Sequence, residues 1–233
     1  MLDRRLSWDG CLNVRDLGGL RLTRGGETRP GAVVRADSLS RLTAAGWESA
    51  LGYGVRRIVD LRADDELDED GAWPGDVTVV RVPILPGSYA DPLWPEFVAI
   101  FEAAGDDERG LRDVYLAFLG RWPESFAAAV AAIAEAGPGP IAVQCGAGRD
   151  RTGLVAALLM DAVGVEHDQI AADYGMTPPI DGAPGATAWV MGEVLRCLRD
   201  MHGGSRGYLA TAGLAEDALE AAVARLHRAS DIL

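Results

Sequence analysis

The sequence predicts an α/β fold: a mostly parallel central sheet flanked by helices, with a helical C-terminal half. Short runs rich in β-branched residues alternate with segments of helical spacing up to about residue 150, which is typical of a parallel sheet crossed by helices. Beyond that point only helical patterns follow. The 233 residues, 48% of them hydrophobic, suffice for one core and are few for two, so we expect a single domain over residues 1–233.

The strands are expected where β-branched residues cluster between turn residues. They cover residues 32–35, 55–61, 77–82 and 141–144, with a possible hairpin at 18–28.

The helices are expected where apolar residues recur at helical spacing. They cover residues 43–51, 93–104, 111–119, 124–135, 151–163, 167–174, 187–201 and 214–229. Gly164 should end the helix before it, as glycine often does. The glycine-rich residues 203–207 predict a loop that separates the last two helices.

Charge and composition exclude several classes of protein. The net charge is −13, which argues against nucleic acid and stable membrane association as general partners. No apolar stretch is long enough to cross a bilayer, and the N-terminal segment lacks the apolar core of a secretion signal. Three widely separated cysteines suggest no disulfide framework, so we expect a reducing, cytoplasmic location.

Two clusters could have indicated a metal site. Residues 64–70 carry six acidic side chains, but glycine does not fall at the sixth position of a calcium loop, nor glutamate at the twelfth. We expect a solvated loop there instead. The three histidines show no metal-ligand spacing, so we expect no metal.

The strongest functional signal lies in residues 141–153, Ile-Ala-Val-Gln-Cys-Gly-Ala-Gly-Arg-Asp-Arg-Thr-Gly. A short apolar strand leads to Cys145, a glycine-bearing turn follows, and Arg151 begins an apolar helical segment. The first N–H groups of such a helix lack partners and can bind an oxyanion. The helix dipole and Arg151 also favour the thiolate of Cys145 over the thiol. We therefore expect an anion-binding loop around a reactive cysteine; the alternative is a buried structural cysteine.

These residues resemble the signature His-Cys-x5-Arg-Ser/Thr of the cysteine-dependent protein tyrosine phosphatase superfamily. More narrowly, they resemble the loop Cys-x-Ala-Gly-Lys-Asp-Arg-Thr-Gly of bacterial and fungal tyrosine phosphatases with dual protein and phosphoinositide activity. Residues 13–19, Asn-Val-Arg-Asp-Leu-Gly-Gly, are similar to that family's Asn-Phe-Arg-Asp-Leu-Gly-Gly. Residues 35–39 are similar to its Arg-Ser-Asp-x-Leu, and residues 59–62 to its Asp-Leu-Arg strand end. Four motifs in the right order are a far stronger signal than the loop alone.

The resemblance implies a tyrosine-phosphatase-like fold and a metal-free, cofactor-free reaction through a phosphocysteine on Cys145. Arg151 would bind the phosphate oxygens, and Thr152 would donate to the sulfur, unless it is an ordinary first-turn residue. The substrate would be a phosphorylated protein or a small phosphomonoester. Further phosphate contacts are expected from the turn residues Gly146, Ala147, Gly148 and Arg149. Arg149 replaces the family's lysine in a chain whose 22 basic residues are all arginine.

The general acid is harder to assign. Asp150 lies where the resembling family has an aspartate credited with acid catalysis. Alternatively, Asp150 only orients the loop or accepts from an N–H group at the start of the helix. Asp37 and Asp60 are reserve candidates at strand ends, where Arg62 would bind substrate or form a structural ion pair. Two Trp-Pro-Glu segments, 94–96 and 122–124, resemble the Trp-Pro-Asp acid loop of other tyrosine phosphatases, but such segments also begin helices.

One residue departs from the superfamily: Gln144 stands where histidine precedes the cysteine. Glutamine supplies a neutral donor but no titrating ring, so activity could be weaker or differ in pH dependence. Three functions therefore stay open: a protein-tyrosine phosphatase, a phosphoinositide or inositol phosphate phosphatase, and a non-catalytic phosphate-binding domain. A sulfurtransferase or arsenate reductase fits the flanking motifs less well. The sequence decides neither the oligomeric state nor whether residues 86–110 form a lid.

Overall fold

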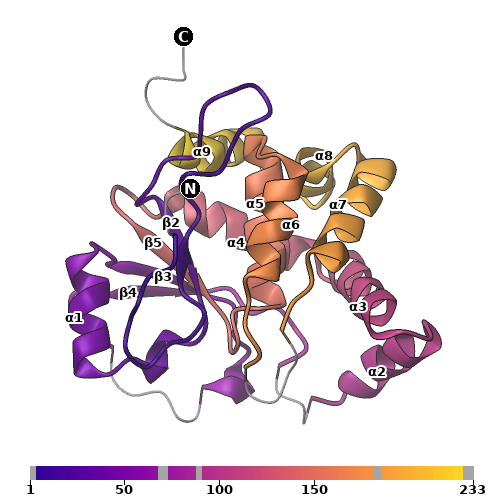
Figure 1. Ribbon diagram of the computed structural model, residues 1–233, viewed down its shortest axis with the longest axis horizontal. Helices are drawn as coiled ribbons and strands as arrows, with labels where there is room; N and C mark the ends of the chain where they lie inside the picture. Colours follow the sequence, from indigo (N-terminus) through magenta and orange to yellow (C-terminus); the bar gives the residue numbers. More distant parts are fainter. Residues whose placement is uncertain (1–3, 68–72, 88–90, 181–184, 228–233) are drawn as a thin grey trace.

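The computed structural model describes residues 4–67, 73–87, 91–180 and 185–227. Its centre is a five-stranded sheet of order β1-β2-β5-β3-β4 (Figure 1). The strands β2 and β5, β5 and β3, and β3 and β4 pair in parallel, and only β1 runs antiparallel, beside β2. The predicted α/β architecture is therefore confirmed.

The strands are short, and all but β1 overlap predicted ones. They are β1 (Arg15–Asp16), β2 (Val33–Ala36), β3 (Arg57–Asp60), β4 (Thr78–Arg81) and β5 (Ile141–Gln144). Carboxyl ends of parallel strands meet at one edge of a sheet. The loops after β2, β3 and β5 therefore converge there, and Cys145 lies in the last of them.

The helices before the loop that holds Cys145 are α1 (Ala44–Gly52), α2 (Trp94–Ala103), α3 (Asp107–Arg121) and α4 (Pro123–Glu135). Two 3₁₀ turns, η1 (Leu39–Arg41) and η2 (Asp64–Glu66), follow the ends of β2 and β3. Those after it are α5 (Arg151–Val163), α6 (His167–Gly175), α7 (Ala188–His202), α8 (Ser205–Thr211) and α9 (Glu216–Leu226). Figure 1 shows α1 on one side of the sheet and the later helices on the other. Gly164 ends α5 with φ +94°, as predicted. Among the described helices, none combines the length and apolarity that crossing a bilayer requires.

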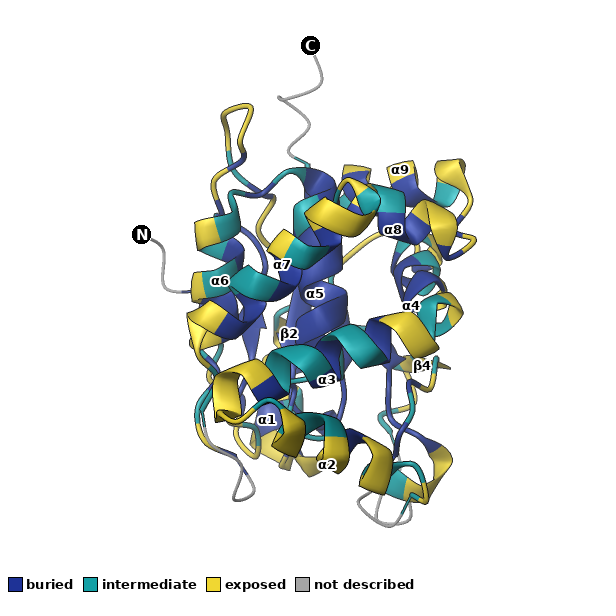
Figure 2. Ribbon diagram, turned by 90° about the vertical axis from the view of Figure 1, so that its right-hand side faces the viewer, coloured by how far each residue is buried: buried dark blue, intermediate teal, exposed yellow. Residues whose placement is uncertain are grey.

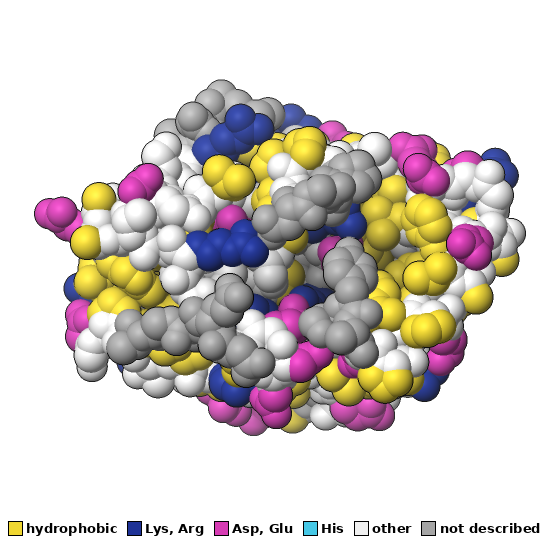
Figure 3. All heavy atoms as spheres, turned by 90° about the horizontal axis from the view of Figure 1, so that it is seen from below, with side chains coloured by type: hydrophobic (Ala, Val, Ile, Leu, Met, Phe, Trp, Pro, Cys, Tyr) yellow, Lys and Arg dark blue, Asp and Glu magenta, His cyan; other side chains and the backbone are white. Residues whose placement is uncertain are grey.

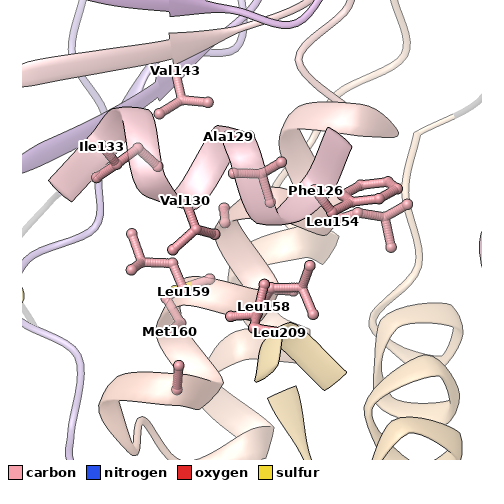
Figure 4. Close-up of a cluster of buried hydrophobic side chains, with 14 of the residues drawn as sticks. Phe126, Ala129, Val130, Ile133, Val143, Leu154, Leu158, Leu159, Met160 and Leu209 are labelled. Carbon is pink, nitrogen blue, oxygen red and sulfur yellow. The ribbon is translucent and has the colours of Figure 1, made fainter. Parts of the chain in front are cut away.

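The core follows the two-residue period of the strands. Val33, Val59 and Val143 face the larger apolar cluster beneath α3–α9, whereas the adjacent Val34 and Ile58 face a smaller cluster beside α1. Helix α5 lies inside the larger cluster: its side chains are buried almost throughout (Figure 2). Figure 4 shows α4 and α5 packing their apolar side chains against each other. This burial fixes the N-terminus of α5 under the carboxyl end of β5.

The break predicted at residues 203–207 is confirmed at Gly203 and Gly204, which separate α7 from α8, but it is wrong for residues 205–207, which belong to α8. The carboxylate of Asp161 accepts from Ser205 N at 2.8 Å, and Arg206 Nε donates to Ala162 O at 2.7 Å. Gly207 lies so close to the end of α7 that an added Cβ would meet His202 O at 1.9 Å. Gly203 and Gly204, at φ +73° and +107°, thus break the chain between the two helices, whereas Gly207 allows α8 to pack closely against the end of α7.

Candidate active site

The loop between β5 and α5 turns its carbonyl groups outward. Ser38 N donates to Gly146 O at 3.0 Å, and Asn13 Nδ2 donates to Ala147 O at 2.9 Å. Arg35 Nη2 donates to the Gly148 carbonyl at 2.7 Å. Three successive peptide groups are thereby fixed from outside the loop.

Four amides of the same loop point away from any described acceptor. Within the described chain, the N–H groups of Gly146, Ala147, Gly148 and Asp150 donate no hydrogen bond. Gly148 has φ +66°, and a Cβ there would lie 2.5 Å from Ala36 O, so the turn requires glycine. Free amides at the start of a helix provide an anion-binding site.

Arg151 is held by a glutamate. Its Nη1 and Nη2 donate to Glu66 Oε2 and Oε1 at 2.5 and 2.6 Å, and both side chains are largely buried. Burial opposes the charge of Arg151, but the bonds to Glu66 and the nearby Cys145 and Asp150 raise its pKa above the ordinary value. Asp64 and Asp65 are exposed, as a solvated loop requires, but Glu66 contradicts that prediction because η2 directs its side chain into the site. Residues 68–70 lie outside the described chain.

Asp150 lies in a network of polar side chains. The Tyr115 hydroxyl donates to Asp150 Oδ1, and the Tyr174 and Tyr115 hydroxyls are 2.6 Å apart. Arg149 Nε also donates to Asp150 Oδ1, at 3.1 Å. Since Asp150 is about one-third exposed, the network fixes the carboxylate and leaves it accessible from the cavity.

A buried ionic hub lies beneath the loop. Asp173 in α6 accepts from Arg4 at 2.7 Å, Arg15 at 3.1 Å and Arg35 at 2.9 Å. Burial lowers the pKa of Arg15 to about 10, with help from the charge of Arg35. Because three arginines face one carboxylate, the hub carries excess positive charge directly behind the loop carbonyls, and this favours an anion in front of them.

Two buried polar atoms near the ends of the loop find no hydrogen-bond partner among the described residues: Nε2 of Gln144, which precedes Cys145, and Oγ1 of Thr152 in the first turn of α5. Cys145 itself is 2% exposed. Gln144 uses its other polar atom, Oε1, to accept from Leu39 N at 2.7 Å. Glutamine thus supports the neighbouring η1 turn, and the bond from Thr152 to the sulfur stays a prediction.

The structure places three further predicted residues behind the loop. Asp37 accepts from the backbone N–H groups of Leu12 and Asn13 at 2.9 and 3.1 Å. Arg62 Nη2 donates to Asp60 at 2.7 Å. All three predicted residues are buried, and none is among the residues that line the cavity.

A cavity of about 640 Å³ opens in front of the loop. Its floor carries Gly146, Ala147, Arg149, Asp150 and Arg151 together with Glu66. One wall is apolar and is formed by Trp94, Phe97, Val98, Phe101, Leu111, Val114, Phe118 and Ile180. Figure 3 shows this end of the molecule, with hydrophobic side chains gathered on the α2 side. No group of three or more metal-ligating side chains occurs in the described ranges.

Both Trp-Pro-Glu segments lie at helix starts, in α2 and α4. Glu96 forms a surface ion pair with Arg121 at 2.6 Å, and only Trp94 of the two segments lines the cavity. Residues 94–110 contribute α2 and the beginning of α3, so part of the segment 86–110, whose role as a lid the sequence left open, forms the cavity wall. Residues 88–90 lie outside the described chain.

Several supporting residues escaped sequence reasoning. Asn13, Arg15 and Arg35 belong to motifs quoted above, but nothing in the motifs shows that two of them bind loop carbonyls. Glu66 was hidden in an acidic run, and its position four residues after Arg62 in the Asp-Leu-Arg segment was its only signal. Tyr115 and Asp173 read as ordinary helix residues, and only the packing of α3 and α6 brings them to the site.

Comparison with known proteins shows the family of the chain. Residues 6–228 match the family described as the tyrosine phosphatase family. The chain is 36% identical over 171 residues to a protein of Cupriavidus necator named as a tyrosine-protein phosphatase, covering 72% of this chain and 61% of that one. It is 27% identical to a tyrosine-protein phosphatase of Nostoc commune, covering 85% and 75%. It is 30% identical to the triple specificity protein phosphatase PtpB of Mycobacterium tuberculosis, covering 71% and 66%. The chain thus spans less than two thirds of the length of the Cupriavidus relative.

Proposed function

Because the chain belongs to the tyrosine phosphatase family, we propose that it hydrolyses phosphomonoesters through a phosphocysteine on Cys145, with phosphotyrosine in proteins as the main substrate. The observation that carries the proposal is the loop in which Ser38, Asn13 and Arg35 hold three carbonyls outward. That arrangement leaves the amides of Gly146, Ala147, Gly148 and Asp150 without an acceptor among the described residues.

In the first step, the Cys145 thiolate attacks phosphorus, and the bond from phosphorus to the ester oxygen breaks. The free loop amides and Arg151 meet the charge on the three non-bridging oxygens. Asp150 gives its proton to the departing oxygen. In the second step, a water molecule attacks phosphorus, the P–S bond breaks, and Asp150 takes up the water proton as phosphate leaves.

The cavity supports an aromatic leaving group. Its apolar wall of α2 and α3 side chains lies beside the loop that binds phosphate. A phenyl ring that enters with its phosphate toward Cys145 would be buried against this wall, which favours it by the hydrophobic effect. Substrates whose phosphate is joined to a small polar group lack this contribution.

Arg149 favours a second candidate, a phosphoinositide or inositol phosphate. It lines the cavity beside Arg151 and could bind a second phosphate of the same substrate. The net charge of −13 disfavours close approach to an anionic bilayer, so we rank this substrate second.

The test compares phosphotyrosine peptides with soluble and lipid inositol phosphates. We expect faster turnover of the peptides, loss of turnover in Cys145→Ser, and unchanged turnover in the matched control Cys197→Ser, since Cys197 is a second free cysteine on α7. Hydrolysis of inositol compounds alone would overturn the substrate preference. Equal, negligible release by the natural chain and Cys145→Ser would indicate a binding domain.

A further inference from the structure

Three arginines gather at the end of the sheet opposite the catalytic loop. Arg57 begins β3, and Arg225 belongs to α9. Both side chains bind the turn before β5: Arg57 Nη1 donates to Pro138 O at 3.0 Å, and Arg225 Nη1 donates to Gly139 O at 2.9 Å. The backbone N–H of Arg29 donates to Leu226 O in α9 at 2.7 Å. Arg57 and Arg225 therefore meet at one surface turn, and Arg29 lies beside the end of α9, close enough for its charge to act on Arg225.

None of these arginines forms an ion pair with a carboxylate in the described part of the chain. By contrast, Arg56, which directly precedes Arg57, forms an ion pair with Asp76 at 2.8 Å. Burial lowers the pKa of Arg225, and the charges of Arg29 and Arg57 lower it further. In a protein of net charge −13, this is a local concentration of uncompensated positive charge.

A purely structural role accounts for only part of the available donors. A guanidinium has five N–H donors; Arg57 uses one and Arg225 uses two on the turn carbonyls. The exposed Arg29 side chain makes no hydrogen bond with a described residue. Planar guanidinium groups with spare donors match the oxygens of phosphate groups.

We propose that Arg29, Arg57 and Arg225 form a second anion site, which binds a compact phosphate-bearing anion of two or more charges. The site lies beyond the start of β5, and the four residue steps from Ile141 to Cys145 separate it from the catalytic cysteine by about 13 Å. A compact anion fits better than an extended anionic surface, which the acidic remainder of the protein would repel. The site does not depend on turnover.

The test is calorimetric titration of the full chain with inorganic pyrophosphate at low salt. One variant, Arg151→Met, removes the catalytic loop arginine. A second, Arg29→Gln/Arg57→Gln/Arg225→Gln, removes three charges but keeps donors for the turn carbonyls. Arg24→Gln, at another exposed arginine, is the matched control. We expect two classes of site in the natural chain, one lost in Arg151→Met and the other weakened about tenfold or more in the triple variant.

If the triple variant does not fold, Arg29→Gln alone gives the answer, because its side chain supports no described contact. We expect about threefold weaker binding. The proposal is overturned by a single class of site that Arg151→Met abolishes, by affinity unchanged in the Arg29 variant, or by a dissociation constant weaker than about 10 mM. Flotation with phosphatidylglycerol vesicles separates a free anion from a lipid headgroup: we expect no binding, and arginine-dependent flotation without pyrophosphate binding would overturn the choice of ligand.

Discussion

Glu66 determines how Arg151 is presented to a phosphate. The carboxylate binds the two terminal nitrogens of the guanidinium and also accepts from Ala63 N at 2.8 Å. Nη1 also donates to the carbonyls of Leu61 and Ile84 at 3.4 Å. Arg151 therefore cannot swing freely between rotamers, and among the described residues its Nε–H and the second N–H of Nη2 have no partner, so they stay available for phosphate oxygens. This makes Glu66 a positioning residue for the proposed reaction.

We predict that Glu66→Gln lowers kcat/KM for an aryl phosphate by about tenfold or more, because a misplaced binding group weakens transition-state contacts. The matched control is Glu96→Gln, which breaks an exposed ion pair with Arg121 and should leave kcat/KM unchanged. Steady-state kinetics of the purified variants check both. A rise in kcat/KM for Glu66→Gln would instead mean that Glu66 competes with the substrate for Arg151.

The sequence identified the residues of the loop but not the residues that hold it. The cysteine, the glycines and the arginine are contiguous, so their spacing and the strand before them predict the loop. The carbonyl contacts of Asn13, Arg35 and Ser38 join segments more than 100 residues apart. Only the strand order of the sheet brings them together, and no local pattern encodes that order.

At the scale of elements, Asp173 joins α6 to the sheet. Its carboxylate binds Arg15 of β1, Arg35 of β2 and Arg4 of the N-terminal segment. Two of these arginines are linked by hydrogen bonds to the loop. Arg35 donates to Gly148 O, and Arg15 donates to Asn13, which in turn donates to Ala147 O. Burial alone would raise the pKa of Asp173, but the charges of Arg15, Arg35 and Arg4 hold it well below its usual value. Through these arginines, helix α6 supports the loop that follows Cys145.

We predict that Asp173→Asn lowers the free energy of unfolding at pH 7 by about 3–5 kcal/mol, because it leaves buried arginines without a counter-charge. The depressed pKa of Asp173 means that its contribution is complete above the unfolded pKa of about 3.9 and is lost as the pH falls toward the folded value. The natural chain should therefore lose more stability than the variant below about pH 4.

Urea unfolding between pH 7 and pH 3 measures this difference. The control is Asp168→Asn, on the exposed side of the same helix and paired with Arg21 at 3.3 Å, which should cost less than about 1 kcal/mol. Parallel pH curves for the natural chain and Asp173→Asn would contradict the role of the hub.

The starts of the helices show which boundaries can be predicted from neighbouring residues in the sequence. Thr43 accepts from Gly46 N and begins α1 as its sequence predicts. Asp106 likewise caps α3, which starts earlier than apolar spacing alone suggested. Helix α8 was missed because its start depends on Asp161, more than 40 residues earlier. Caps supplied by neighbouring residues are readable in the sequence; caps supplied by tertiary contacts are not.

At the scale of the whole molecule, one apolar cluster joins the sheet to the C-terminal helices. It runs from Val59 and Val143 in the sheet through α4 and α5 to Leu209 in α8 and Leu226 in α9. The loop around Cys145 lies between β5 and α5, which both belong to it. The catalytic loop and the C-terminal helices should therefore unfold together, as the prediction of a single domain requires.

We predict one cooperative transition and a loss of about 2–5 kcal/mol for Leu209→Ala, since Leu209 is completely buried in this cluster. Circular dichroism and tryptophan fluorescence should give the same midpoint in urea for the natural chain and for the variant, and both midpoints should move together. Leu12→Ala is the matched control, because Leu12 is 72% exposed and should change stability by less than about 0.5 kcal/mol. If Leu209→Ala separates the two signals, α7–α9 unfold independently of the sheet, and the chain contains more than one folding unit.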